Sequence, residues 1–356
     1  MNKAHGTKFY EPHRYTTSNS SKMSESVEPI TSSVQFSKLY LTKDEVALCK
    51  RATIHDELLY TVKKKEIFQF IKELIKKLKS PLKILQSFGY YFQRFFLFND
   101  FKKNINSCHE IAICALYIAM KNNDYIKRLK DVIAMGNQIR NLPCTSEALD
   151  EQKKKIFSFE KKFLEVIAFD FRAFSVEDFL IKYSKTLGVH PDVTYLAWII
   201  SNDSYFTELV LTSAPYNISQ GCLLLGFDLY EELNPGKLDQ EISTWKEGLL
   251  KSRKISPNPF FVLSAKNDLL TYFIEQWDGS FLSSMVEAEN LNDHILNIKL
   301  KLAHEPEMKG RKRAIALEES SDDLFYKPRD YEVGKVGTIR FLYHKREFLE
   351  EMRKTV

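Results

Sequence analysis

The side chains that could carry out catalysis or hold a metal ion are scattered along this chain. The eight histidines show no metal-ligand spacing, and Cys108 and His109 are adjacent, which does not fit a zinc site. Gly334–Gly337 is too short for a phosphate-binding loop and lacks a strand–helix context. No Gly-x-Ser-x-Gly elbow and no kinase catalytic loop is present. We therefore expect no catalytic residues, no cofactor and no metal, and we favour a binding protein over an enzyme.

Two charged residues stand in unusual apolar surroundings. Every residue of Ile111–Met120 is apolar, and this run ends abruptly in Lys121. Glu160 has Phe157 and Leu164 as neighbours at i−3 and i+4, so apolar residues surround it on one helix face. A carboxylate in that setting indicates a surface for a partner. The alternative is a wide core stripe with Glu160 merely exposed, and spacing alone does not separate the two.

The elements that position these two residues are predicted to be helices. The run 111–120 is too short to span a bilayer, which takes about 20 apolar residues. A helix that is apolar on all sides must be surrounded by other helices. We expect the central helix to begin near residue 105, with amphipathic helices around it near 61–79, 81–98, 129–139 and 150–168.

A second set of about five helices is expected to follow. Apolar spacing predicts them near 175–187, 193–200, 218–229, 245–250 and 269–277. The predicted fold class is therefore all-α, with two tandem five-helix bundles at 36–173 and 174–280. Residues 1–35 are rich in Ser, Thr and Lys and are predicted to form a disordered tail. Residues 281–356 are predicted to be a flexible and mostly irregular extension.

Composition places limits on the class of protein. The chain has 356 residues, of which 44% are hydrophobic, and this supports two sizeable cores. Only 12 Gly and 11 Pro argue against an all-β fold, and a net charge of +5 does not by itself imply nucleic acid. The five cysteines form no Cys-x-x-Cys pair, and the N-terminus has no apolar signal core. A reducing compartment fits best, and no association with a membrane is expected.

Two segments are notably basic. Lysines crowd the segment 61–83, for which we favour a solvated helix face over a contact with an acidic partner. Lys309–Arg313 is a short basic cluster of the kind that can direct nuclear import. Such clusters are also common by chance, so the role of this one stays open.

Three segments of the first helix set resemble signatures of the cyclin family. Tyr91–Phe95 resembles the Arg-Phe signature at the end of the second cyclin-box helix. Ala115–Lys121 is similar to the third-helix signature, which ends in a lysine. Glu160–Asp170 is similar to the fifth-helix signature, a Glu followed by Leu and then Phe-Asp. The resemblance covers roughly residues 36–280, and it implies that both bundles are cyclin-box folds.

The resemblance also implies roles for individual residues. Lys121 and Glu160 would form the charged pair that grips a partner kinase, with Leu164, Phe169 and Phe171 making apolar contacts beside them. The mechanism implied is repositioning of the regulatory helix of the kinase, so that its active-site Lys–Glu pair forms. The chain itself would be a regulatory subunit and not an enzyme.

The chain departs from the family pattern at several positions. Many cyclins follow the lysine with two acids, where this chain has Asn122 and Asn123, and the Ser often found before it is Met120. The Met-Arg-Ala-Ile-Leu substrate-docking sequence of cell-cycle cyclins is missing, and Lys63–Ile67 occupies about that place. Some polar contacts with the kinase, and substrate recruitment in the cell-cycle manner, are therefore in doubt.

Two further segments are most similar to the transcriptional cyclins. Gln93–Asn99 and Tyr195–Ile200 look most like the fungal cyclin (beta) subunits of kinases that phosphorylate the RNA polymerase II carboxy-terminal domain. The resemblance implies a nuclear protein, with the cytoplasm as a second compartment, that activates a cyclin-dependent serine/threonine kinase in transcription elongation. The kinase would be its partner and the polymerase tail the substrate, with a third subunit left open and no direct nucleic-acid binding.

Two alternatives to a kinase regulator remain. A general transcription factor of the same fold would bind promoter DNA and would need a basic surface on the second bundle, yet 174–240 contains no Lys/Arg cluster. A helical scaffold without a kinase fits the composition but leaves Glu160 unexplained.

Overall fold

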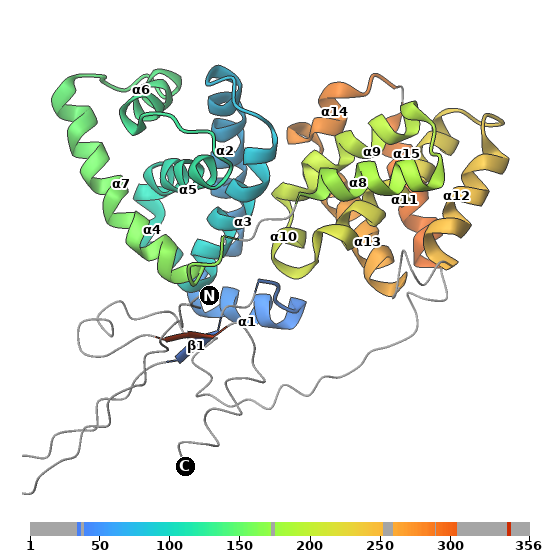
Figure 1. Cartoon of the computed structure of the whole chain (residues 1–356), viewed down its shortest axis with the longest axis horizontal. Coiled ribbons are helices and arrows are strands. Elements are labelled where there is room, and N and C mark those ends of the chain that lie inside the picture. Colours follow the sequence, from blue (N-terminus) through green and yellow to red (C-terminus); the bar gives the residue numbers. More distant parts are fainter. Residues whose placement is uncertain are drawn as a thin grey trace, which may run out of the picture.

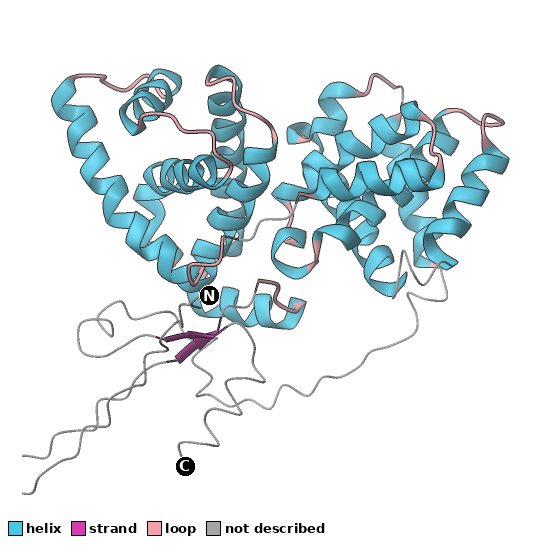
Figure 2. Ribbon diagram, viewed as in Figure 1, coloured by secondary structure: helices cyan, strands magenta, loops and turns pink. Residues whose placement is uncertain are grey.

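The computed structural model of this chain describes residues 34–36, 39–171, 175–251, 259–288, 290–304 and 340–342. Almost all of this part is helical, and the helices form two bundles that lie side by side (Figures 1 and 2). The predicted all-α class with two tandem bundles is confirmed. No helix in the described ranges is long and apolar enough to cross a membrane.

The first bundle consists of five main helices, four of which pack around the fifth. They are α2 (Glu57–Lys77), α3 (Lys83–Phe98), α5 (Cys108–Asn122), α6 (Leu129–Ile139) and α7 (Ser146–Val166). All four neighbours contact α5. Every residue from 111 to 120 is buried except Tyr117, as a helix that is apolar on all sides requires.

Side chains at the helix ends define where these elements begin. The Asp56 and Thr145 side chains accept hydrogen bonds from the first turns of α2 and α7, so each satisfies a backbone N–H that has no partner within its helix. The predicted start of the central helix near residue 105 is three residues early. The short α4 (Phe101–Asn104) and a 3-10 turn, η1 (Ile105–Ser107), precede α5.

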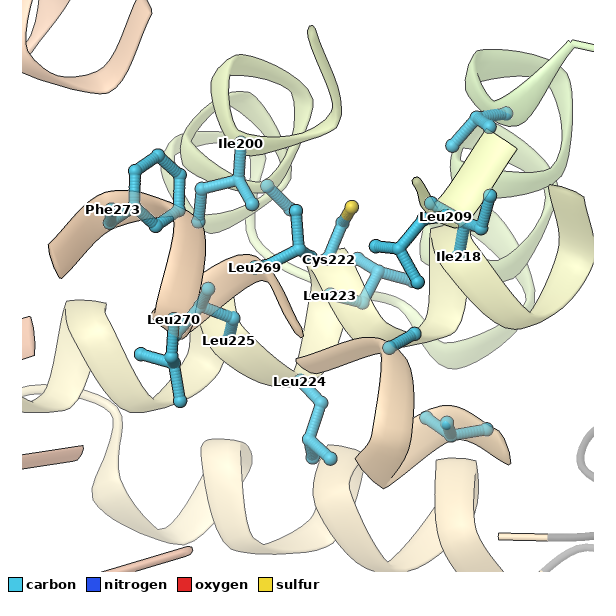
Figure 3. Close-up of a cluster of buried hydrophobic side chains, with 14 of the residues drawn as sticks. Ile200, Leu209, Ile218, Cys222, Leu223, Leu224, Leu225, Leu269, Leu270 and Phe273 are labelled. Atoms are coloured by element: carbon cyan, nitrogen blue, oxygen red, sulfur yellow. The ribbon is translucent and has the colours of Figure 1, made fainter. Parts of the chain in front are cut away.

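The second bundle is built around α11 (Pro215–Leu233), and Figure 3 shows buried side chains of this helix together with those of its neighbours. Gly226 and Gly221 allow this helix to approach Ala197 and the backbone of α13 (Pro259–Glu275) closely, since an added Cβ would meet them at 3.0–3.1 Å. The other main helices are α8 (Val176–Leu187), α9 (Pro191–Asp203), α12 (Asp239–Lys251) and α13 (Pro259–Glu275).

Several elements were not predicted from the sequence. They are α1 (Lys43–Thr53), η2 (Ser204–Phe206), α10 (Leu209–Thr212), η3 (Trp277–Gly279), α14 (Phe281–Met285) and α15 (Leu291–Ala303). The last two lie beyond residue 280, where a mostly irregular extension was expected. Ile295, Ile298 and Leu302 of α15 are at most 2% exposed and belong to the second core, so 281–303 differs from that expectation.

The two bundles meet across α3. A Cβ added to Gly89 would lie 2.6 Å from the carbonyl oxygen of Tyr205, so only glycine permits this approach. The buried Gln93 side-chain amide donates to the carbonyl oxygens of Tyr205 and Thr207, at 3.1 and 3.0 Å. Phe206 inserts toward Phe68 of α2, with 4.7 Å between ring centroids. These contacts hold the second bundle against the first.

Two short strands are also described. β1 (Val34–Phe36) pairs in parallel with β2 (Arg340–Leu342). Most of the predicted tails, 1–35 and 281–356, lies outside the described residues, as does the basic cluster 309–313.

Candidate functional site

The structure joins the two charged residues that the sequence singled out. Lys121 is in the last turn of α5 and Glu160 is in α7, and Lys121 Nζ lies 2.7 Å from Glu160 Oε1. The Lys121 side chain is 45% exposed and that of Glu160 is 26% exposed. Residues 39 positions apart therefore form one ion pair at the surface, where a second protein can reach both groups.

The local structure of α5 favours a cation at this position. Lys121 sits at the carboxyl end of the helix, where the helix dipole and the unpaired carbonyls stabilise positive charge. Its amine also lies 4.5 Å from the ring centroid of Tyr117, one helical turn earlier. Tyr117 was not among the site residues predicted from the sequence. The spacing of an aromatic residue and a lysine four positions apart could have indicated it.

The chain turns sharply after α7. Ala168 and Phe169 both have positive φ angles, of 53° and 55°. This left-handed conformation is unfavourable for residues with a side chain, and it is concentrated at functional sites when the surrounding structure enforces it. The Phe169 N–H donates to the carbonyl oxygen of Leu164 at 3.1 Å. As a result Phe169 is 54% exposed, and Phe171, two residues on, is 38% exposed.

A buried arginine anchors this turn. Arg94 of α3 is 1% exposed, and its Nε donates to the carbonyl oxygen of Val166 at 3.1 Å. The guanidinium lies between the rings of Tyr90 and Phe98, each 5.5 Å away. Arg94 therefore satisfies a carbonyl at the end of α7 that has no helical partner. It entered the sequence analysis only as part of a motif, and its positioning role was missed.

Four of the five residues of the predicted site are linked in space, and Phe171 follows two residues after Phe169. Lys121 and Glu160 touch directly, Leu164 follows Glu160 by one turn of α7, and Phe169 bonds to Leu164 through the backbone. Leu164 is half-buried and packs against the first core. The side chains on the core-facing side of this segment are at most 8% exposed; they are Ile156, Phe159, Phe163, Val166 and Ile167.

Two buried cysteines and one histidine lie in surroundings that suppress their chemistry. Burial raises the pKa of the Cys49 thiol to about 11 and that of Cys108 to about 12, so both stay protonated near neutral pH. Burial lowers the pKa of His109 to about 4. Within the described ranges, no three His, Cys, Asp or Glu side chains gather where they could hold a metal ion.

Comparison with known proteins identifies similar chains. No family model matches this chain. It is 26% identical over 260 residues to CTD kinase subunit beta of Saccharomyces cerevisiae, covering 72% of this chain and 76% of that protein. It is 29% identical over 139 residues to cyclin-K of Homo sapiens, covering 38% of this chain and 24% of cyclin-K.

A solved structure shares the fold. The chain superimposes with a TM-score of 0.77 on one chain from the crystal structure of the yeast RNA Pol II CTD kinase CTDK-1 complex. That alignment covers 90% of this chain and 99% of the other, with 24% sequence identity.

Proposed function

We propose that this chain, a cyclin of the transcriptional group, is the regulatory subunit of a cyclin-dependent serine/threonine kinase that phosphorylates the carboxy-terminal domain of RNA polymerase II. Its similarity to CTD kinase subunit beta and to cyclin-K supports the family. The tandem bundles shared with the CTDK-1 complex support the fold. The chain acts by binding the kinase and carries out no chemistry itself.

One observation carries the assignment of the kinase-binding surface. Lys121 and Glu160 form an accessible ion pair, and the strained turn after α7 exposes Phe169 and Phe171 beside it. Exposed aromatic rings next to a charged pair have the composition of an interface core with a polar component. We refer to Lys121, Glu160, Leu164, Phe169 and Phe171 as the kinase-facing patch.

The patch supplies two kinds of interaction. The rings of Phe169 and Phe171 lose solvent contact when a partner covers them, at about 25 cal/mol per Å² of apolar surface. The ion pair orients the partner, because a misplaced docking partner would leave a charge buried without a counter-charge. A kinase held in this way has its regulatory helix fixed, so that its active-site Lys–Glu pair can form.

The test is reconstitution from purified components. The kinase subunit alone, this chain alone and the two together are incubated with ATP and a polymerase-tail peptide. We expect phosphate transfer from the mixture and none from this chain alone. Activity of this chain after complete removal of kinase would reject the regulatory role. A stable complex without any increase in kinase activity would also reject activation.

A transcriptional role implies a place of action. We propose that the protein acts in the nucleus during elongation, with a cytoplasmic pool before import, and that Lys309–Arg313 directs import. Replacing the four basic residues of that cluster by Ala in a fluorescent fusion should raise the cytoplasmic share. Unchanged nuclear signal would remove this role from the cluster.

Co-purification of the intact protein would show whether the complex contains a third subunit.

The alternative of a promoter-binding factor has less support. It needs free basic side chains on the second bundle. Lys246 and Lys266 of that bundle are both engaged by the carboxylate of Asp228.

A further inference from the structure

A cleft lies between the two bundles, away from the kinase-facing patch. One wall is α2 of the first bundle, and the other is formed by η2, α10 and the end of α13. The cavity has a volume of about 370 Å³, within the range of small-ligand sites. The kinase-facing patch belongs to α5, α7 and the turn after α7, so a ligand in the cleft and a kinase on the patch use different elements.

Salt bridges join α1, which also lines the cleft, to the second bundle. Lys43 pairs with Asp268 at 2.7 Å, and Lys50 pairs with Glu208 at 2.9 Å and also contacts Glu57. These contacts use three of the four carboxylates that line the cleft, and Glu275 is the fourth. The same contacts use two of the five lysines that line the cleft, Lys43 and Lys50.

The other three lysines form a row on α2. Lys64, Lys65 and Lys72 line the cavity, and none of them has an ion pair within the described part of the chain. Positions 64, 65, 68 and 72 share one helix face, so the amines point to the same side. Eight residues of helix separate the ends of the row by about 12 Å, since each residue rises about 1.5 Å. With five lysines against four carboxylates in its lining, the cleft keeps an excess of one positive charge.

Two amines of this row, those of Lys64 and Lys72, are partly removed from solvent. Burial lowers the pKa of Lys64 and of Lys72. The Lys72 amine donates to the carbonyl oxygen of Gly279 at 3.0 Å and lies 4.0 Å from the ring centroid of Phe281. The carboxylates of Glu57, Glu208 and Glu275 lie near Lys64, and that of Asp203 lies near Lys72. None of them forms an ion pair with these lysines within the described residues, so an anion entering the cleft would gain charge-assisted hydrogen bonds.

Aromatic rings form the remaining wall. Phe68 and Phe206 lie 4.7 Å apart, and Phe206 stacks on Tyr272 at 6.4 Å with 17° between the ring planes. All three line the cavity. The cleft thus combines cations with an apolar surface, and this suits an extended peptide better than a free inorganic ion. Four residues of extended chain span about 13 Å, close to the length of the lysine row.

We propose that this cleft binds a phosphorylated peptide segment, with Lys64, Lys65 and Lys72 contacting its phosphate and Phe68, Phe206 and Tyr272 contacting its side chains. A phosphate ester carries close to two negative charges at neutral pH and three acceptor oxygens, which matches several lysines better than one carboxylate does. The choice of a phosphopeptide over other anions rests on the proposed function, because the regulator of a kinase meets its phosphorylated product. Binding in the cleft would hold a partly phosphorylated substrate close to the kinase.

The test measures binding by the full chain without the kinase. The probe is a fluorescent polymerase-tail peptide with one phosphoserine, and its unphosphorylated form is the control peptide. We expect at least tenfold tighter binding of the phosphorylated form, weakening as salt is added. The double variant Lys64→Gln/Lys72→Gln should lose at least tenfold in affinity. Lys65→Gln is a milder second variant with a smaller loss.

A matched control lies on the same helix. Lys77 of α2 pairs with Glu73 at 3.3 Å and does not line the cleft, so Lys77→Gln should leave peptide affinity unchanged. Thermal melting confirms that each variant is folded. Affinity for the kinase subunit, measured in parallel, should be unchanged in all of them.

Several outcomes would overturn the proposal. Equal affinity for both peptides would show that phosphate is not recognised, and unchanged affinity in folded Lys64→Gln/Lys72→Gln would show that the cleft is not the site. Single-stranded RNA that competes as strongly would indicate a general polyanion site instead. Failure to bind the kinase, with phosphopeptide binding intact, would reject the proposed function and leave the cleft assignment supported.

Discussion

Replacing Glu160 by Ala separates an interface role from a purely structural one. In the free protein, Glu160 and Lys121 are 26% and 45% exposed, so their ion pair is screened by solvent. Pairs of this kind contribute about 0–1 kcal/mol to folding. We therefore expect Glu160→Ala to change the melting temperature of the isolated chain only slightly. The removed side chain also leaves no cavity, because it lies at the surface.

The expected cost in kinase binding is much larger. When a partner covers the patch, both charges lose water, and removal of one of them leaves the other buried without a counter-charge. Such truncations cost about 2–5 kcal/mol of binding free energy. Since about 1.4 kcal/mol is tenfold in affinity, we expect binding to weaken by at least about tenfold. Glu160→Lys should be worse, because it places a like charge beside Lys121.

The assay is titration calorimetry with the purified kinase subunit, together with thermal melting of each free variant. Asp150 provides a matched control, because it is also on α7 and pairs with Lys130 at 2.7 Å. It lies about 15 Å along the helix from Glu160, at about 1.5 Å per residue. Asp150→Asn should leave kinase affinity unchanged.

A charge swap tests which contact matters. Lys121→Glu/Glu160→Lys can restore the ion pair within the chain, but it reverses both charges presented to a partner. We expect the swap to melt like the wild type and still bind the kinase poorly. Full binding by the swap, or unchanged affinity in a folded Glu160→Ala variant, would refute the assigned interface.

Three further predictions concern stability and boundaries. Gly89→Ala places a Cβ 2.6 Å from the carbonyl oxygen of Tyr205, so denaturant unfolding should show a loss of about 1–3 kcal/mol. Burial raises the pKa of Asp203 from 3.8 to about 7, so its neutral form stabilises the fold below about pH 4 and that contribution is lost as pH rises through about 7. The wild type should therefore lose stability relative to Asp203→Asn between pH 5 and pH 8, as measured by denaturant unfolding. A chain ending at residue 304 should keep its melting temperature and bind the kinase, whereas one ending at 280 loses the buried side chains of α15 and should melt lower.

Each of these predictions has a contrary result. Gly248→Ala is the control for Gly89, because its added Cβ meets only the end of the Leu187 side chain at 3.0 Å. Equal losses in the two glycine variants would argue against the close approach. Parallel stability curves for wild type and Asp203→Asn across that pH window would contradict the raised pKa of Asp203. Equal melting of the two shortened chains would show that α15 does not support the second core.

Local pattern in the sequence was enough to predict the main helices. The apolar run at 111–120 fits only a helix with neighbours on every side, and α5 occupies that position. The helix expected near 150–168 was equally clear, because helical periodicity is a local pattern, and α7 occupies most of that range. Short or weakly periodic elements such as α1, α10 and α15 were missed. Their stability comes from packing on other helices and not from their own pattern.

The candidate site, too, was predicted only in part from the sequence. The types and spacing of residues marked Lys121 and Glu160 as unusual. Their separation of 39 positions in the sequence says nothing about how far apart they are in space. Only the packing of α7 against α5 places the amine and the carboxylate 2.7 Å apart. The left-handed turn at Ala168 and Phe169 and the anchoring role of Arg94 had no signal that sequence alone could interpret. The lysines of 61–83 were noticed as a basic segment, but nothing in the sequence showed that three of them face the second bundle. Helical periodicity is a local property of the chain and can be read from the sequence. Contacts between distant segments depend on how the helices cross, and this is decided only when the whole core has packed.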